Sequence, residues 1–212
     1  VSELQDVMKM SEKLAIQNHS RYQNFPKNFT KSNCSPALFV FKGDVYDYMD
    51  VKNYSEQDLS FAQEHLAILS GLYGILKPLD LMFHYRLEIG LAISIEKYTS
   101  LYTFWKEKIT EEINSRLSHS KTVVNLCSNE YFKVIDKKLL DKSVSIITPV
   151  FREKKGDSYK TVAIYAKRAR GSMADFIIKN KITNTDDIKQ FTKEGYQYRE
   201  ELSKKTQFVF VR

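Results

Sequence analysis

The stretch SVSIITPVFREKKGDSYKTVAIYAK, residues 143–167, decides the fold class of this 212-residue chain. Two runs that are rich in β-branched and aromatic residues, 143–153 and 159–167, lie on either side of the turn KKGDS. This pattern predicts two strands that form an antiparallel hairpin. The next segment, 169–182, predicts a helix, and QFVFVR at 207–212 predicts a last strand.

Helices and strands are mixed along the rest of the chain. The helical patterns, with apolar residues spaced near 3.6, cover four segments: 2–19, 55–74, 101–117 and the residues that follow Thr185. The other patterns are a loop broken by two prolines, a short strand or buried segment, and a strand that opens into a polar loop: 20–36, 37–46 and 121–128. No repeat, linker or low-complexity segment appears. We therefore predict a mixed α/β (α+β) fold, with a single domain over residues 1–212 and a mixed sheet flanked by helices.

The composition is that of an ordinary globular protein, with 42% hydrophobic and 28% charged residues. No run of about 18 apolar residues occurs, so we expect no transmembrane helix. The two cysteines, Cys34 and Cys127, lie too far apart in the chain for a disulfide framework or a metal-site motif. Each thiol is expected to be a small buried apolar group. The cysteine usage favours the cytoplasm, and we expect no cofactor and no bound metal.

The formal net charge is +7, and most of it lies in one segment. Residues 152–181 hold nine basic and three acidic side chains, a net charge of +6. The rest of the chain is almost neutral. Such concentrated positive charge favours an anionic partner: nucleic acid, a small anionic ligand or a membrane surface.

The segment LSGLYGILKPLD, residues 69–80, has two glycines, Gly71 and Gly74, at the predicted end of a helix. Glycine lets a backbone approach an anion closely, and free N–H groups at the start of a following helix bind phosphate. With Lys77 adding charge, this layout predicts a helix-hairpin-helix-like element that grips nucleic-acid phosphates without reading bases. The alternative is an ordinary helix end with one glycine in the left-handed conformation.

The segment FHYRLEIG, residues 83–90, places polar side chains among apolar ones. Tyr85 and Arg86 are suited to stacking on a ligand or pairing with it, but Arg86 is equally suited to a structural ion pair with Glu88. A lone His84 is a weak signal, and no second His or Cys stands at metal-ligand spacing.

The segment NLCSNEY, residues 125–131, follows directly after a predicted strand, where functional sites often lie. The candidate side chains are Asn125, Ser128, Glu130 and Tyr131. Glu130 is suited to act as a base or to cap the next turn. No histidine can be assigned as a partner to Ser128, so a hydrolase triad is unsupported.

The segment YAKRARG, residues 165–171, concentrates cations at a predicted junction between strand and helix. Lys167, Arg168 and Arg170 would lie beside a helix N-terminus near Gly171, and both features favour an anion such as phosphate. Tyr165 adds an aromatic ring of the kind that interleaves with bases in nucleic-acid sites. The alternative is a solvated basic turn.

Several motifs together resemble one protein family. They are FKGDVY (41–46), FAQEHLAILSGLYGILKPLDLM (61–82), YRLEIG (85–90), LYTFW (101–105), VVNLCSNEYF (123–132), IYAKRARGSM (164–173) and EGY (194–196). Their order and spacing over residues 10–211 closely resemble the YaaA family of bacterial peroxide-stress proteins. The sequence departs from the family in lacking its first strand and the Ser-Pro-Ala-Lys-Thr-like segment after it. We therefore expect a native N-terminal segment to precede Val1.

The resemblance implies a YaaA-like fold, which is a single α/β domain with a positively charged cleft and a helix-hairpin-helix-like element. Family members are cytoplasmic and help bacteria survive hydrogen peroxide by limiting free iron, and one member binds DNA, favouring distorted or unpaired duplex. Carried onto this chain, the hairpin role falls on Gly71, Leu72, Tyr73, Gly74 and Lys77. The cleft role falls on Arg86, Lys167, Arg168 and Arg170, and the basic segment adds Lys160 as a further DNA-binding candidate.

The main hypothesis is a DNA-binding stress protein without catalysis, which binds distorted or unpaired duplex and limits free iron. The alternative is an enzyme acting on a small phosphorylated or nucleotide-like ligand, with Asn125, Ser128, Glu130 and Tyr131 beside Lys167 and Arg168. A third idea, direct iron binding, is weakened by the small number of His and Cys residues. We expect a monomer without membrane contact, and the sequence indicates no protein partner.

Overall fold

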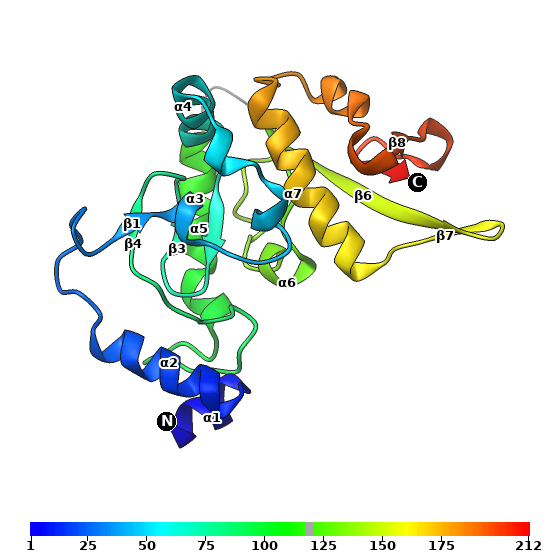
Figure 1. The fold of residues 1–212 in the computed structure, drawn as a ribbon. Helices are drawn as coiled ribbons and strands as arrows, with labels where there is room; N and C mark the ends of the chain where they lie inside the picture. The colour runs from blue at the N-terminus through cyan, green and yellow to red at the C-terminus, as the bar shows by residue number, and fades with distance from the viewer. Residues whose placement is uncertain (118–120) are drawn as a thin grey trace. The chain divides into compact units, whose positions relative to one another are not determined.

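The structure is a computed structural model that describes residues 1–117 and 121–212. The chain forms two compact units. Unit 1 comprises Val1–Val40, Leu66–Ser115 and Asn129–Leu140, and unit 2 comprises Phe41–His65, Arg116–Ser128 and Asp141–Arg212. Both units mix helices and strands, which confirms the predicted mixed α/β class (Figure 1). That residues 1–212 form a single domain stays a prediction.

Unit 2 contains a mixed sheet with the strand order β5-β6-β9-β8. Its strands are β5 (Thr122–Val124), β6 (Ser145–Lys155), β7 (Ser158–Lys160), β8 (Gln197–Tyr198) and β9 (Gln207–Val211). β6 is parallel to β5 and β9, β8 is antiparallel to β9, and β7 is antiparallel to the end of β6. β6 buries alternate residues, as a strand does when one face covers a core. The strands predicted at 143–153 and 207–212 are confirmed, and within 121–128 the strand is confirmed for Thr122–Val124.

Helix α7 (Ala163–Lys179) packs against β6 and covers the core of unit 2 (Figure 1). Ala166, Ala169 and Met173 lie on one face of this helix and are buried. They belong to the same core cluster as Ile147 and Phe151 of β6. The two alanines are small, so the helix backbone lies close to the sheet.

The junction between the hairpin and α7 differs from the prediction. β7 ends at Lys160 and α7 begins at Ala163, so the strand predicted over 159–167 is wrong after its second residue. The run AIYAKRAR is rich in alanine, lysine and arginine, which favour a helix. Periodicity is ambiguous in such a short run, and burial against the sheet decides the outcome.

Unit 2 also contains α4 and several short 3-10 helices. α4 (Glu56–His65) begins at a capping box: the Asp58 N–H donates to Ser55 Oγ (3.1 Å), and the Ser55 N–H donates to Asp58 Oδ2 (2.9 Å). The predicted start of this helix is confirmed, but it ends at His65, well before Gly71. The 3-10 helices are η1 (Tyr46–Tyr48), η2 (Val51–Asn53), η3 (Thr185–Gln190), η4 (Lys193–Gly195) and η5 (Glu200–Leu202).

Unit 1 consists of helices and two small antiparallel sheets. The helices are α1 (Ser2–Met8), α2 (Glu12–Gln23), α3 (Ala37–Val40), nearly all of α5 (Leu101–Arg116) and α6 (Asn129–Phe132). The strand pairs are β1 (Ser35–Pro36) with β4 (Leu81–Met82), and β2 (Ile68–Ser70) with β3 (Gly74–Leu76). The helical patterns predicted at 2–19 and 101–117 are confirmed. The segment predicted as a short strand or buried segment is buried at Ala37, Leu38 and Val40, but it forms α3.

Candidate anion-binding surface

Residues 68–76, which were predicted to end a helix, form a β-hairpin in unit 1. Gly74 has a φ of 77°, and a Cβ built there would lie 2.6 Å from the Trp105 ring. A Cβ built at Gly71 would lie 2.1 Å from the Leu87 carbonyl oxygen, and the Gly71 carbonyl accepts from Trp105 Nε1 at 2.8 Å. Close packing within the unit therefore accounts for both glycines.

Backbone N–H groups of this segment bind acceptors inside the protein. The Tyr73 N–H donates to Ser70 Oγ at 2.9 Å, and the Lys77 N–H donates to Asp80 Oδ2 at 2.7 Å. Leu72 and Tyr73 form the turn and are half-buried. The helix-hairpin-helix-like element predicted at 69–80 is therefore corrected to a β-hairpin, because the preceding helix has already ended.

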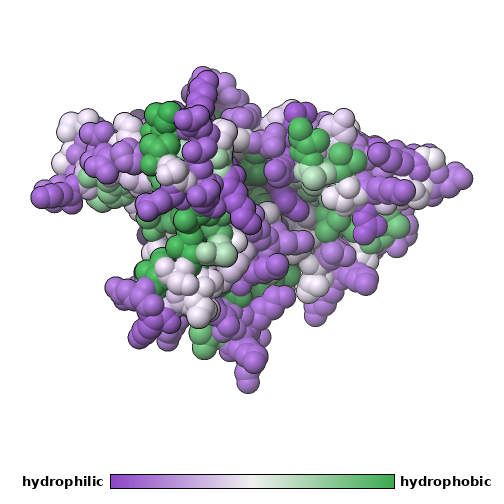
Figure 2. Space-filling model, turned by 90° about the horizontal axis from the view of Figure 1, so that it is seen from below, coloured by the Kyte–Doolittle hydropathy of each residue, from purple (hydrophilic) through white to green (hydrophobic). Residues whose placement is uncertain are grey.

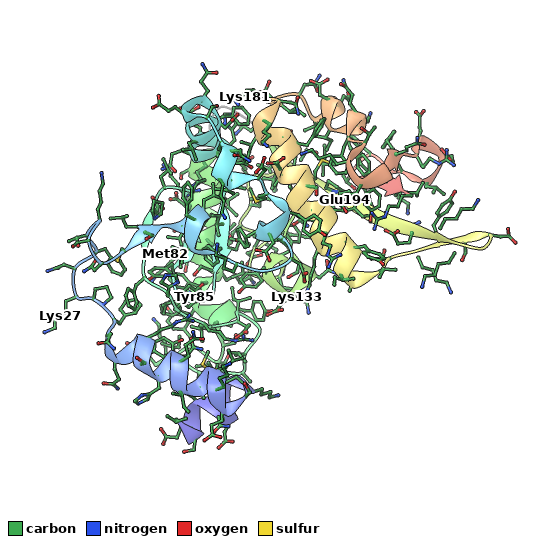
Figure 3. The ribbon with its side chains drawn as sticks, in the orientation of Figure 1. Lys27, Met82, Tyr85, Lys133, Lys181 and Glu194 are labelled. Carbon is green, nitrogen blue, oxygen red and sulfur yellow. The ribbon has the colours of Figure 1, made fainter. Side chains whose placement is uncertain are left out.

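Arg86 forms the structural ion pair that was one of its two sequence-based interpretations. Its Nη2 lies 2.6 Å from Glu88 Oε1. Tyr85, labelled in Figure 3, shares a hydrogen bond of 2.5 Å with Ser70 Oγ. Burial raises the pKa of the Tyr85 hydroxyl well above its usual value, so this group stays protonated.

Glu130 holds a neighbouring loop of unit 1. Its Oε1 accepts from the Gly90 N–H at 3.1 Å, and its carbonyl oxygen accepts from the Tyr102 hydroxyl at 3.0 Å. Burial, followed by the charge of Glu130, raises the pKa of Tyr131 to about 12. Glu130 thus has a structural contact with the Gly90 loop, which differs from the predicted cap of the next turn. Asn125 and Ser128 belong to unit 2, so a pocket formed by all four candidates stays a prediction.

Lys167, Arg168 and Arg170 lie within α7, and not at a junction between strand and helix. The helix begins at Ala163, so the predicted N-terminus near Gly171 is wrong. Lys167 Nζ and Arg168 Nε each lie 4.0 Å from an Asp44 carboxylate oxygen, which is a loose contact. The Arg168 guanidinium also lies 5.3 Å from the centre of the Tyr48 ring.

The two lysines at the end of the basic segment are neutralised by carboxylates from residues 41–65. Lys179 Nζ lies 2.8 Å from Asp50 Oδ2. Lys181, labelled in Figure 3, binds Asp58. The contiguous charge counted in residues 152–181 is therefore only partly available to a ligand.

Within residues 152–181, the exposed cations come from hairpin β6–β7 and the first turns of α7. We call Lys154, Lys155, Lys160 and Lys167 the lysine surface. Hydrophilic residues cover the hairpin, which projects at the right of the view in Figure 2. Tyr165 is 37% exposed on the same stretch of α7, and the Arg212 guanidinium lies 4.8 Å from its ring centre. The predicted site set omits Lys154 and Lys155, although both were counted in the basic segment. Their position beside the turn KKGDS was the available signal.

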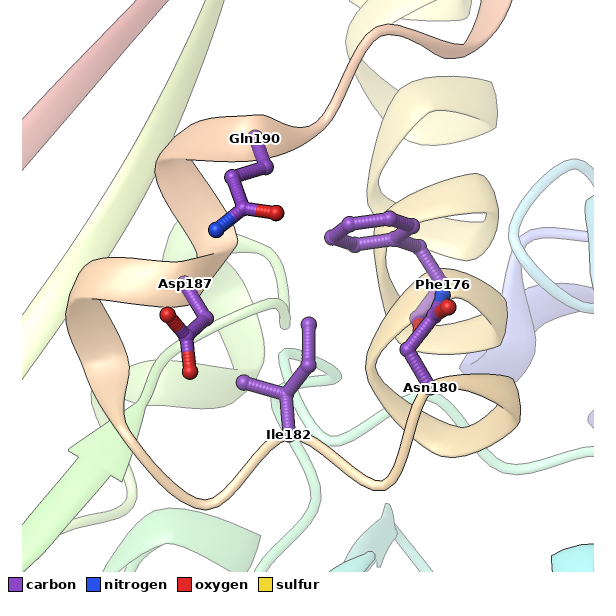
Figure 4. Close-up of a pocket in the computed structure, with 5 residues that line it drawn as sticks. All are labelled: Phe176, Asn180, Ile182, Asp187 and Gln190. Carbon is purple, nitrogen blue, oxygen red and sulfur yellow. The ribbon is translucent and has the colours of Figure 1, made fainter.

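A separate hollow of about 330 Å³ lies between the end of α7 and η3 (Figure 4). Its lining residues are Phe176, Asn180, Ile182, Asp187 and Gln190, none of which the sequence singled out. The only charge among these five is the Asp187 carboxylate, so the hollow does not favour an anion.

Two features typical of other kinds of site are absent from residues 1–117 and 121–212. No group of three or more His, Cys, Asp or Glu side chains there is arranged to hold a metal ion. No helix in those same ranges combines the length and apolar character that a bilayer crossing requires. Cys34 is buried, Cys127 is half-buried, and both are free thiols.

The fold and the exposed lysines define a mixed α/β protein with a lysine-rich face on unit 2. Over residues 1–202 the sequence matches the family described as peroxide stress protein YaaA, so the chain belongs to that family. The resemblance inferred from the motifs is thereby confirmed.

Similar proteins cover nearly the whole chain. A UPF0246 protein of Teredinibacter turnerae is 46% identical over 212 residues, which are 99% of this chain and 82% of the relative. A UPF0246 protein of Colwellia psychrerythraea is 46% identical over 213 residues, covering 100% of this chain and 82% of the relative. One of Aliivibrio fischeri is 47% identical over 208 residues, covering 97% and 80%.

Proposed function

We propose that this peroxide stress protein protects DNA by binding it through the lysine surface of unit 2. The observation that carries the proposal is the exposure of these four lysines. Of these four, only Lys167 has a carboxylate of a described residue within 4.0 Å, and that contact is at the limit. A cation without an internal partner gains most from an external anion.

Lysine ammonium groups bind backbone phosphates and release counterions, whatever the base sequence. The lysine surface therefore favours binding that tolerates sequence and weakens with salt. Tyr165 offers an exposed ring on which an unpaired base can stack. This ring supports a preference for distorted or unpaired duplex over plain duplex.

The other predicted DNA contacts have less physical support. Tyr73 and Lys77 use their backbone N–H groups internally, and Arg86 is paired with Glu88. DNA contacts from these residues and from the other candidates stay a prediction: Gly71, Leu72, Gly74, Arg168 and Arg170. Limitation of free iron and a cytoplasmic location are proposed from the family resemblance alone.

The test is a fluorescence-anisotropy titration with plain duplex, bubble duplex and single strand of one sequence. We expect the bubble duplex to bind most tightly. The double variant Lys160→Gln/Lys167→Gln removes two of the four lysines without touching the core. It should weaken binding to all three DNAs by about tenfold or more, because lysine binds backbone phosphate in the same way whatever the base sequence.

The matched control is Lys13→Gln/Lys138→Gln, which removes the same charge from exposed positions of unit 1. It should bind DNA nearly as well as the wild type. Equal losses in the two double variants would mean that net charge alone attracts DNA, and would overturn the assigned surface. Absence of binding by the folded wild type would overturn DNA binding and favour a small phosphorylated ligand.

A further inference from the structure

Arg170 is half-buried, as are Arg168 and Lys179 of the same helix, but Arg168 and Lys179 each have a carboxylate within 4.0 Å. Arg170 follows Ala169, which is fully buried in the core cluster that also contacts Val124 and Leu126. Loss of hydration lowers the pKa of Arg170. No carboxylate in the described ranges lies within 4.0 Å of its guanidinium, in contrast to Arg212, which lies 2.8 Å from Glu153.

The loop that follows β5 lies near this part of α7: Val124 and Leu126 pack against the core cluster of Ala169, and the Cys127 thiol is close enough to interact electrostatically with Arg170. Asn125 is only 7% exposed. Its Oδ1 accepts from the Cys127 N–H at 3.2 Å and from the Cys127 Sγ at 3.0 Å. Among the described residues its Nδ2 reaches only Thr148 Oγ1, at 3.4 Å, which is a long contact for an amide donor. This buried amide therefore has donor capacity left over.

Cys127 does not supply the missing negative charge. Burial raises the pKa of its thiol to about 11, although the nearby Arg170 acts in the opposite direction. The thiol is therefore neutral at pH 7 and gives Arg170 no counterion. A partly desolvated cation without a counterion is costly, and proteins usually pair such a group.

The loop with Asn125 and Cys127 also lies at a place where ligands commonly bind in sheets with parallel strands. β5 and β6 are parallel, and Asn125 follows the carboxyl end of β5. Crevices outside the carboxyl ends of parallel strands are frequent ligand sites. We propose that Arg170, Asn125 and the Cys127 loop bind one phosphate group of a small ligand, such as inorganic phosphate or a phosphomonoester.

The proposed chemistry uses groups already present. The guanidinium fork donates two parallel hydrogen bonds to phosphate oxygens. The Asn125 amide donates to a third oxygen, and the phosphate supplies the charge that Arg170 lacks. The proposal does not rest on DNA binding, because the lysine surface contains none of these residues.

The first test measures thermal stability and calorimetric binding with inorganic phosphate, against sodium chloride at equal ionic strength. Phosphate should raise the melting temperature of the wild type more than chloride does. Arg170→Gln should bind phosphate about 10- to 100-fold more weakly, the expected loss of a charge-assisted hydrogen-bonding pair. Lys205→Gln removes an exposed charge from the same unit, outside the lysine surface, and should leave phosphate binding unchanged.

A second variant tests the proposal independently, in case Arg170→Gln does not fold. Cys127→Asp places a carboxylate next to Arg170 and should make the protein more heat-stable, but insensitive to phosphate. Cys127→Ser is its control and should keep the phosphate response. If Arg170 is already satisfied, Cys127→Asp will lower the melting temperature instead, and the proposal is overturned.

A DNA titration of Arg170→Gln distinguishes a small phosphorylated ligand from a phosphate of the DNA backbone. Arg170→Gln should keep its affinity for bubble duplex within about twofold, a change well under 1.4 kcal/mol. An equal loss of phosphate and DNA affinity would identify a DNA backbone phosphate as the ligand and would overturn a small-ligand site. A wild type that responds equally to phosphate and chloride would overturn the phosphate site, whatever the DNA result.

Discussion

At the scale of single residues, long-range pairs decide which charges of unit 2 remain available. Asp175 is fully buried, and its carboxylate accepts from the Lys193 ammonium at 2.6 Å and from the Asp50 N–H at 3.0 Å. Asp58 binds Lys181, which is 123 residues away in the chain. Pairs of this kind remove cations from the surface, so composition overstates the charge that a ligand meets.

Asp58 also makes stability depend on pH. Lys181, followed by the Ser55 N–H and hydroxyl groups, lowers the pKa of the Asp58 carboxyl to about 2. An unfolded aspartate has a pKa of about 3.9, so ionised Asp58 stabilises the fold fully above that value. This stabilisation is lost as the pH falls toward about 2. We expect Asp58→Asn to be less stable than the wild type at pH 7, with a gap that closes between about pH 4 and pH 2.

Urea unfolding at a series of pH values measures this gap. The control is Asp186→Asn, which breaks a pair with Lys189 in which Asp186 is 69% exposed. Exposed pairs contribute only about 0–1 kcal/mol, so the control should change little at any pH. A gap for Asp58→Asn that stays constant down to about pH 2 would contradict the assigned pair.

At the scale of elements, the sequence predicts those whose periodicity repeats over several turns or residues. α5, β6 and β9 appear close to their predicted bounds. The start of α7 and the hairpin 68–76 were mispredicted. Both are short runs in which strand and helix patterns look alike, and contacts with distant residues decide between them.

The contact between α7 and the residue before η1 can be tested by the sign of a change in the free energy of unfolding. A Cβ built at Gly171 of α7 would lie 1.9 Å from the Val45 carbonyl oxygen, just before η1. Alanine ordinarily stabilises a helix by about 1 kcal/mol relative to glycine. Here the clash is with backbone, so we expect Gly171→Ala to lower the free energy of unfolding by about 2 kcal/mol or more. Chemical denaturation measures this change.

Gly156→Ala is the control, because Gly156 has a φ of 60° and a Cβ added there would meet no atom within 4 Å. The left-handed conformation alone should cost about 1 kcal/mol. A stabilised Gly171→Ala protein would show that η1 does not pack against α7 as described.

At the scale of the whole molecule, a net charge of +7 attracts polyanions without choosing a binding face. The face is chosen by which cations lack internal partners. On hairpin β6–β7 and the start of α7, the four lysines of the lysine surface are exposed, and only one of them, Lys167, has a carboxylate of a described residue within 4.0 Å. Family membership fits a role in peroxide stress but does not by itself locate a binding site.

The salt dependence of DNA binding tests this choice of face. If each of the four lysines neutralises one phosphate of duplex DNA, log K should fall against log salt with a slope of about −3.6. Lys160→Gln/Lys167→Gln should reduce the slope to about −1.8. Titrations at several salt concentrations give both slopes. An unchanged slope in the variant would exclude the two lysines from phosphate contact.

The sequence by itself determined the fold class, the main helices and strands, the family and the location of the basic segment. Those properties depend on local periodicity, composition and ordered motifs, which are all written along the chain. Only the tertiary structure decided that Lys179 and Lys181 are neutralised and that Gly71 and Gly74 serve packing. It also decided that no carboxylate of a described residue lies within 4.0 Å of Arg170. The physical reason is that charge neutralisation and burial depend on residues far away in sequence, which folding brings within a few ångströms.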